Sequence, residues 1–220
     1  MKKFALACAM GLALCGSAAA NDWMANGGAT RDWSGSYFGL QGGGGWGDTA
    51  TIQGALTSGS YDLDGAFGGW TSGHNWQKGA WVWGIESDSS LSNIGGSIKS
   101  ICATNCYGEI NWFSTIRGRL GYATGMFLLY GTAGLAYGEV ESGLTAPQPS
   151  SDGINAGLAI GGGVEMALNQ DWSAKIEYLH INLGDNTTAG TVVTDFSDIN
   201  LVRVGVNRKF DLWGLLTGTK

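Results

Sequence analysis

The strongest constraint in this sequence is a strand pattern with charge and glycine on one face and large apolar residues on the other. In 114–123, STIRGRLGYA, Arg117 and Arg119 share one face of a β-strand, and Ile116 and Leu120 lie on the opposite face. In 158–168, Glu165 shares its face with glycines. Glycine weakens a solvent-facing strand. A narrow lumen better explains glycine on the charged face, because glycine leaves room for the charged side chains beside it. The pattern therefore predicts strands with polar faces inward and apolar faces toward lipid.

The same alternation predicts eight strands joined by loops of two kinds. We expect strands at about 33–46, 62–76, 80–91, 108–123, 126–140, 153–168, 172–184 and 198–210. Tight turns at 77–79, 124–125 and 169–171 alternate with longer polar segments at about 47–61, 92–107, 141–152 and 185–197. Short and long connections alternate in this way in outer-membrane barrels, whose short turns face the periplasm. The predicted fold is an all-β, eight-stranded, antiparallel, up-and-down transmembrane β-barrel.

Aromatic residues and the absence of long apolar runs agree with a membrane barrel. Beyond residue 20, no apolar run approaches the roughly 18 residues that a membrane helix needs. Tryptophan, tyrosine and phenylalanine cluster toward the predicted strand ends, as interfacial girdles require. These aromatic residues are Trp46, Trp76, Trp81, Trp112, Tyr122, Trp172 and Phe210.

The N-terminus reads as a secretory signal. Two lysines, an apolar stretch and Ala18-Ala19-Ala20 predict cleavage between Ala20 and Asn21. A lipoprotein signal at Cys15 is the weaker alternative, because Leu14 stands where a small residue would be expected. The expected parts are then a signal peptide at 1–20, a periplasmic segment at 21–32, the barrel at 33–210 and a periplasmic tail at 211–220.

The charge balance excludes a nucleic-acid-binding role. The chain has 12 basic and 18 acidic residues, and two of its lysines lie in the signal, so the mature chain has a net charge of −8. A basic stripe that could bind nucleic acid is absent.

Several stretches together resemble the small eight-stranded outer-membrane proteins of alphaproteobacteria, which are labelled porin-family, opacity-like or OmpA-barrel-like. The matching stretches are WSGSYFGLQGG (33–43), GGWTSGHNWQ (68–77), VWGIESD (82–88), NWFSTIRGRLGYA (111–123), LLYGTAGLAYG (128–138), IGGGVEMAL (160–168), WSAKIEYLHINLG (172–184) and VRVGVNRKF (202–210). The resemblance implies contact with outer-membrane lipid and lipopolysaccharide, and surface exposure with contacts to host or other cell surfaces through the outer loops. It also implies that the barrel-assembly machinery recognises a terminal aromatic residue. Phe210 fits that role, although ten residues follow it.

The charges assigned to the lumen balance one another. Five carboxylates and five cations are predicted to point inward: Glu86, Asp88, Glu109, Glu165 and Glu177, with Arg117, Arg119, Lys175, Arg203 and Lys209. This set could be a selectivity ring or a self-neutralised polar core. An eight-stranded interior can be filled by side chains, and isolated buried charges are costly, so the polar core is favoured.

Catalytic and metal sites are poorly supported. The two histidines, His74 and His180, both fall on the apolar parity of their strands, near opposite ends of the barrel. We therefore predict no enzymatic activity, no cofactor and no metal. The expected role is structural, with outer loops available for surface contacts. A narrow solute channel and a secreted soluble β-barrel that binds a ligand are the two alternatives.

Cys102 and Cys106, in ICATNC, mark the second long loop. Their spacing suits a disulfide or half of a zinc site, but no second pair of cysteine or histidine residues lies nearby. Once the signal is removed they are the only cysteines, in an oxidising compartment. We therefore predict a disulfide that fixes the tip of this loop.

Overall fold

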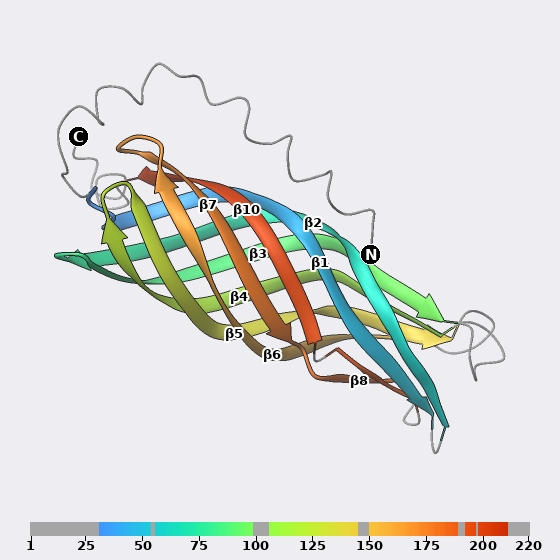
Figure 1. The fold of residues 1–220 in the computed structure, drawn as a ribbon. Helices are drawn as coiled ribbons and strands as arrows, with labels where there is room; N and C mark the ends of the chain where they lie inside the picture. The colour runs from blue at the N-terminus through green and yellow to red at the C-terminus, as the bar shows by residue number, and fades with distance from the viewer. Residues whose placement is uncertain are drawn as a thin grey trace, which may run out of the picture.

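The protein forms a closed, tilted antiparallel β-barrel (Figure 1). The computed structural model describes residues 31–53, 56–98, 106–144, 150–188, 192–196 and 198–210. Its strands are β1 (Gly35–Gln53), β2 (Leu56–Lys78), β3 (Trp81–Ile98), β4 (Cys106–Thr124), β5 (Phe127–Leu144), β6 (Ser150–Ala167), β7 (Trp172–Asn182), β8 (Asp185–Thr188), β9 (Val192–Asp195) and β10 (Asp198–Phe210).

Eight of these strands make the wall. From β1 to β7, each strand pairs with the next strand along the chain, and β10 pairs with β7. The ring closes where β10 also pairs with β1, from Ser36–Phe210 to Asp48–Asp198. The predicted eight-stranded up-and-down barrel is therefore confirmed. The short hairpin β8–β9 lies between β7 and β10 and attaches to the far end of β1.

The three tight turns lie at one end, here called the turn end, and the longer connections lie at the loop end. Gly79 and Gly125 occupy turn positions with φ of 62° and 56°, a conformation that favours glycine. In the third turn, the Asn169 side-chain oxygen accepts hydrogen bonds from the amides of Asp171 and Trp172, both at 2.9 Å. The predicted turn positions are correct to within a residue or two.

The predicted strand 198–210 matches β10, but several other strands are longer at the loop end than predicted. The strands from β1 to β6 have 18 to 23 residues. Of these, β1, β2 and β3 continue six or seven residues into segments predicted to be loops, and β4, β5 and β6 continue two to four residues. The segment 185–197 was also predicted to be a loop and contains β8 and β9. A membrane strand needs only about 9–11 residues, so roughly half of each long strand extends beyond the bilayer.

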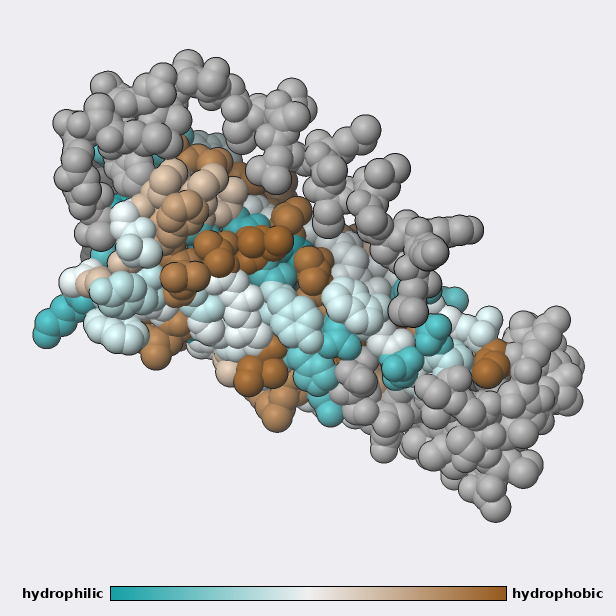
Figure 2. All heavy atoms as spheres, in the orientation of Figure 1, coloured by the Kyte–Doolittle hydropathy of each residue, from teal (hydrophilic) through white to brown (hydrophobic). Residues whose placement is uncertain are grey.

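The barrel reverses its pattern along its length. In the membrane part, the inward residues of the middle section are polar, and the outward ones are apolar, as in Leu40, Ile85 and Val204. Near the loop end the inward residues are apolar, as in Leu63 and Ile94, whereas Asp62 and Asp64 point outward. On the face seen in Figure 2, hydrophobic residues gather over the turn-end and central parts of the wall. The membrane part is therefore inside out, and the protruding part has the pattern of a soluble protein.

A β-bulge changes the facing of Glu109, which corrects one prediction. Between Ile110 and Trp112, β4 has one residue more than β5 in the register. Below the bulge Phe113 and Thr115 are buried, and above it the buried residue is Ile110. An extra residue shifts the two-residue period by one. Glu109 is therefore exposed on the outside, opposite Glu141, and does not point into the lumen.

Candidate functional site

Arg117 is at the centre of a buried ion-pair network inside the membrane part of the barrel. It projects from β4, and its Nη2 lies 2.7 Å from Glu86 Oε1 and 2.8 Å from Asp88 Oδ2, both carboxylates of β3. Its Nη1 lies 3.0 Å from Glu177 Oε1 of β7, on another side of the barrel. One guanidinium thus links strands that are not neighbours in the wall.

The other three cations extend this network. Arg203 pairs with Glu177, and its Nη2 is also 3.2 Å from Asp88 Oδ2. Lys175 Nζ lies 2.8 Å from Glu86 Oε2, and Arg119 Nη2 lies 2.8 Å from Glu165 Oε2. We call the whole set the charged layer. It consists of Glu86, Asp88, Arg117, Arg119, Glu165, Lys175, Glu177 and Arg203.

The charged layer is electrically balanced and buried. Four carboxylates face four cations, and no residue of the layer is more than 4% exposed. Buried charges are tolerated when they are paired and hydrogen-bonded, and removing one partner is strongly destabilising. The arrangement therefore acts as a solid polar core that fills the section of the lumen within the membrane.

Eight of the ten predicted lumen charges lie in this layer, and Glu109 and Lys209 do not. Glu109 lies outside the wall above the β4 bulge. Lys209 lies at the turn end, where its Nζ donates a hydrogen bond to the backbone oxygen of Asp32 at 2.9 Å. Its parity is inward, but its position one residue from the strand end places it at the mouth. The charged layer stays neutral because the two residues that lie outside it, Glu109 and Lys209, carry opposite charges.

Sequence reasoning missed the tyrosines that complete the layer. The hydroxyl of Tyr37 donates to Glu86 Oε2 at 2.8 Å, and the hydroxyl of Tyr130 donates to Glu177 Oε2 at 2.7 Å. A Cβ on Gly73 would lie 2.4 Å from the Tyr37 hydroxyl oxygen, and one on Gly163 would lie 2.8 Å from that of Tyr130. The inward glycines therefore leave space for these side chains. In the sequence, both tyrosines fall at inward positions of the two-residue alternation of their strands, and this could have identified them as lumen residues.

The segment before β1 closes the mouth at the turn end. We call residues 31–34 the strap. Trp33 is 3% exposed and packs in the lumen with Val82, Ala123 and Leu128. Its amide donates to Gln77 Oε1 at 2.6 Å, and Arg31 Nη1 donates to the Trp172 backbone oxygen at 3.0 Å.

Within the strap, Asp32 is held in its charged form. Burial raises its pKa, but hydrogen bonds from the Ser34 hydroxyl and amide, together with Lys209, outweigh this effect. The pKa of Asp32 therefore lies below its usual value.

An apolar cluster fills the lumen on the other side of the charged layer. We call it the loop-end core. Its members are Tyr61, Leu63, Phe67, Ile94, Ile110, Phe113, Ala136, Val140, Ala159, Leu179, Ile181, Leu183, Phe196, Ile199 and Leu201. The lumen thus has three filled sections in series: the strap with its apolar neighbours, the charged layer and the loop-end core.

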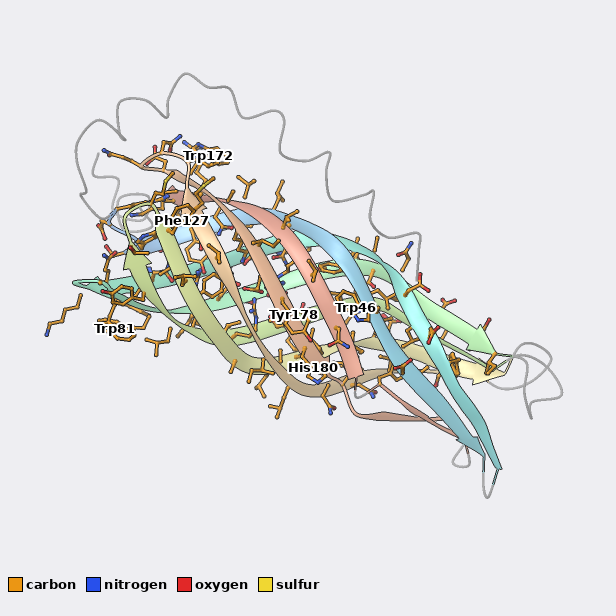
Figure 3. All side chains as sticks on the ribbon, in the orientation of Figure 1. Trp46, Trp81, Phe127, Trp172, Tyr178 and His180 are labelled. Atoms are coloured by element: carbon orange, nitrogen blue, oxygen red, sulfur yellow. The ribbon has the colours of Figure 1, made fainter. Side chains whose placement is uncertain are left out.

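Aromatic residues mark two levels on the outside of the wall (Figure 3). Trp81, Phe127 and Trp172 lie near the turn end, and Trp46, Tyr178 and His180 lie farther along the barrel. The Tyr178 hydroxyl donates to the Asn200 side-chain oxygen at 2.6 Å. Two such levels are typical of the aromatic girdles of membrane barrels.

The two histidines lie far apart on the outward parity. His74 is at the turn end of β2, with its Nδ1 2.9 Å from the Ser36 hydroxyl and its ring against Trp76. His180 is near the end of β7, with its Nδ1 3.3 Å from the Asn200 side-chain oxygen. In the part of the chain that the structure describes, no three His, Cys, Asp or Glu residues are grouped to hold a metal ion.

The signal cleavage at Ala20–Asn21, Cys102 and the tail at 211–220 lie outside the described residues. The Cys102–Cys106 disulfide therefore stays a prediction. Phe210 is the last residue of β10 and pairs with Ser36 of β1 at the closure of the barrel.

Known proteins share both this sequence and this fold. Residues 4–210 match the family model described as outer membrane protein beta-barrel domain. The 31 kDa outer-membrane immunogenic protein of Brucella melitensis biotype 1 is 35% identical over 208 residues, which cover 82% of this chain and 85% of that protein. The 22 kDa outer membrane protein of Rhizobium leguminosarum bv. viciae is 36% identical over 148 residues, 66% of each chain.

Among solved structures, the outer membrane protein OprG from Pseudomonas aeruginosa has the same fold. It aligns with a TM-score of 0.56 at 14% identity, over 83% of this chain and 100% of that chain. The predicted resemblance to outer-membrane barrels of alphaproteobacteria and the predicted location are confirmed by these relatives. The chain belongs to the outer membrane protein beta-barrel domain family and resides in the outer membrane, in contact with its lipids.

Proposed function

We propose that this protein is a sealed, non-enzymatic outer-membrane barrel that supports the envelope and carries a surface for contact outside the cell. The observation that carries this proposal is the filled lumen. The strap, the charged layer and the loop-end core occupy the interior in series, and the charged layer is neutral and at most 4% exposed.

The filled lumen argues against the narrow solute channel. A selectivity ring needs charges that face water and lack full partners, whereas the guanidinium of Arg117 contacts three carboxylates. An eight-stranded barrel is also just wide enough for its own side chains to fill it. The exposed apolar residues of the membrane part argue against the soluble ligand binder.

The positions of the two histidines, both on the outward face of the barrel wall, support the absence of catalysis. His74 and His180 are at opposite ends of the barrel; His74 Nδ1 lies 2.9 Å from the Ser36 hydroxyl, and His180 Nδ1 lies 3.3 Å from the Asn200 side-chain oxygen. A nucleophile of the serine type also needs a third group that orients the histidine.

The protruding part supplies the proposed contact surface. Its outward acids include Asp48, Asp62, Asp64, Glu109, Glu139 and Glu141. Within the described residues, the loop-end parts of the strands contain no lysine or arginine. We infer that this end faces the cell exterior, where it lies among lipopolysaccharide headgroups and is available to host or other cell surfaces. Phe210, at the end of the closing strand, is the proposed signal for the barrel-assembly machinery.

Planar-bilayer recording tests the sealed barrel against the channel. Mature protein refolded into bilayers should give no steady, ion-selective current, because ions would have to displace three packed sections. A matched variant, Trp33→Ala with Arg117→Ala, should give rare currents at most, since the loop-end core stays filled. Reproducible ion-selective currents from the wild type, altered by Arg117→Ala, would establish the channel instead.

A further inference from the structure

Three buried polar atoms in and beside the charged layer have no hydrogen-bond partner within the described residues. They are Gln41 Oε1, Asp88 Oδ1 and Arg203 Nη1. All three residues are more than nine-tenths buried. Buried polar groups in folded proteins are nearly always hydrogen-bonded, and those without a protein partner are typically bonded to an ordered water or an ion. The three atoms therefore point to a bound molecule.

The contacts of these residues bring the three atoms to the same side of the lumen. Arg203 projects from β10, and its Nη2 lies 3.2 Å from Asp88 Oδ2 of β3. In the wall, β1 and β2 stand between β10 and β3, so this contact spans both strands. Gln41 lies on β1, and its Nε2 donates to Ser90 Oγ at 3.5 Å. Ser90 is two residues from Asp88 on the same inward face of β3. The Gln41 amide therefore lies beside the contact between Arg203 and Asp88.

Glycine occupies the inward positions next to these residues. Gln41 is opposite Gly205 of β10 and Gly69 of β2, and Arg203 is opposite Gly43 of β1. Residues opposite each other in a sheet point to the same face. The adjacent strands therefore supply no side chain at these positions that could pair with the three atoms, and a small molecule is the partner that fits.

The chemistry of the three atoms identifies this molecule as water. The amide oxygen of Gln41 and the carboxylate oxygen of Asp88 are acceptors, whereas the guanidinium nitrogen of Arg203 is a donor. A water molecule donates two hydrogen bonds and accepts others, so one molecule satisfies all three atoms. A metal ion would face the N–H group of Arg203, and an anion would face the carboxylate of Asp88, so neither ion suits the set.

We propose that Gln41, Asp88 and Arg203 bind one ordered water inside the lumen. The water donates to Gln41 Oε1 and to Asp88 Oδ1, and it accepts from Arg203 Nη1. It completes the hydrogen bonding of the charged layer on the side of β1, where glycine supplies no partner. The strap and the loop-end core lie on either side of this level. The water therefore exchanges slowly with the bulk solvent and provides no path for ions.

A crystal structure of the mature protein, at a resolution that shows ordered waters, is the first test. Density for one water should lie within about 2.7–3.2 Å of Gln41 Oε1, Asp88 Oδ1 and Arg203 Nη1. Absence of density at this position, or three atoms that are paired with protein groups instead, would overturn the proposal.

Oxygen-17 relaxation dispersion of the solvent is the second test, because it counts waters that stay inside a folded protein. In detergent micelles, Gln41→Leu should lower this number by one, since it removes the amide at similar size. Thr132→Val is the matched control. Its buried hydroxyl already donates to the Gly118 backbone oxygen at 2.9 Å, so its loss should leave the number unchanged. Equal numbers for the wild type and Gln41→Leu would overturn the proposal. If Gln41→Leu does not fold, the crystal structure alone decides.

Discussion

Removing Arg117 should be one of the most damaging single changes in the lumen. Arg117→Ala takes away the partner of Glu86, Asp88 and Glu177 and leaves the charged layer with one excess negative charge. Breaking a buried ion pair by removing one partner costs about 3–5 kcal/mol, and the cavity left behind favours the upper part of that range. Urea unfolding in lipid vesicles, followed by the gel shift between folded and boiled protein, measures the loss.

Two further variants separate the charge effect from other causes. Arg117→Met combined with Asp88→Asn restores neutrality with similar volume, and should recover about 2 kcal/mol or more, because a buried ion pair replaced by neutral groups is often tolerated. Arg208→Ala is the matched control. Arg208 is exposed over the Trp172 ring, so its loss should cost about 1 kcal/mol or less. Equal costs for Arg117→Ala and Arg208→Ala would refute the paired charged layer.

Three further changes test other parts of the barrel. Val204→Arg, on the lipid-facing wall, should lower the free energy of unfolding in vesicles by about 2–4 kcal/mol. Asp64→Arg, outward on the protruding part, should change it by no more than about 0.5 kcal/mol. Equal costs for the two variants would contradict the reversal of faces. Trp33→Ala should cost about 3 kcal/mol and raise amide exchange at the turn-end mouth, and unchanged exchange would mean that the strap does not close it. Phe210→Ala should slow assembly into the outer membrane, whereas deletion of 211–220 should not, and a tail deletion that blocks insertion would place the assembly signal elsewhere.

The sequence predicted the membrane part of the fold because one rule governs it. Lipid outside and a narrow lumen inside force apolar and polar residues to alternate with period two. Arg117 and Glu86 were assigned inward for that reason, and they lie together in the charged layer. The tight turns were also predictable, because Gly79 and Asn169 have local conformational roles.

The protruding part was not predicted because the rule reverses there without a break in the strand. In β2, the inward apolar residues Leu63 and Phe67 have the same parity as the inward polar residues Thr71 and Asn75. The change in solvent outside the wall, from lipid to water, explains the reversal. The segment YDLDGAF (61–67) lies almost wholly in the predicted strand 62–76, and its apolar alternation was a visible signal that the inward face becomes apolar there. Glu109 was misassigned because a bulge adds a residue, which a parity count cannot detect.

A spin-label accessibility scan along the outside of the barrel tests the reversal of faces most directly. Nitroxides are attached to single cysteines at outward positions, in protein whose Cys102 and Cys106 are replaced by serine, and collisions with oxygen and with a water-soluble nickel complex are compared. Labels replacing Val204 and Ile85 should favour oxygen, as in lipid, and labels replacing Asp62 and Asp64 should favour nickel, as in water. Nickel access at Val204, or lipid-like access at Asp62, would contradict a barrel that is inside out within the membrane and has a soluble pattern above it.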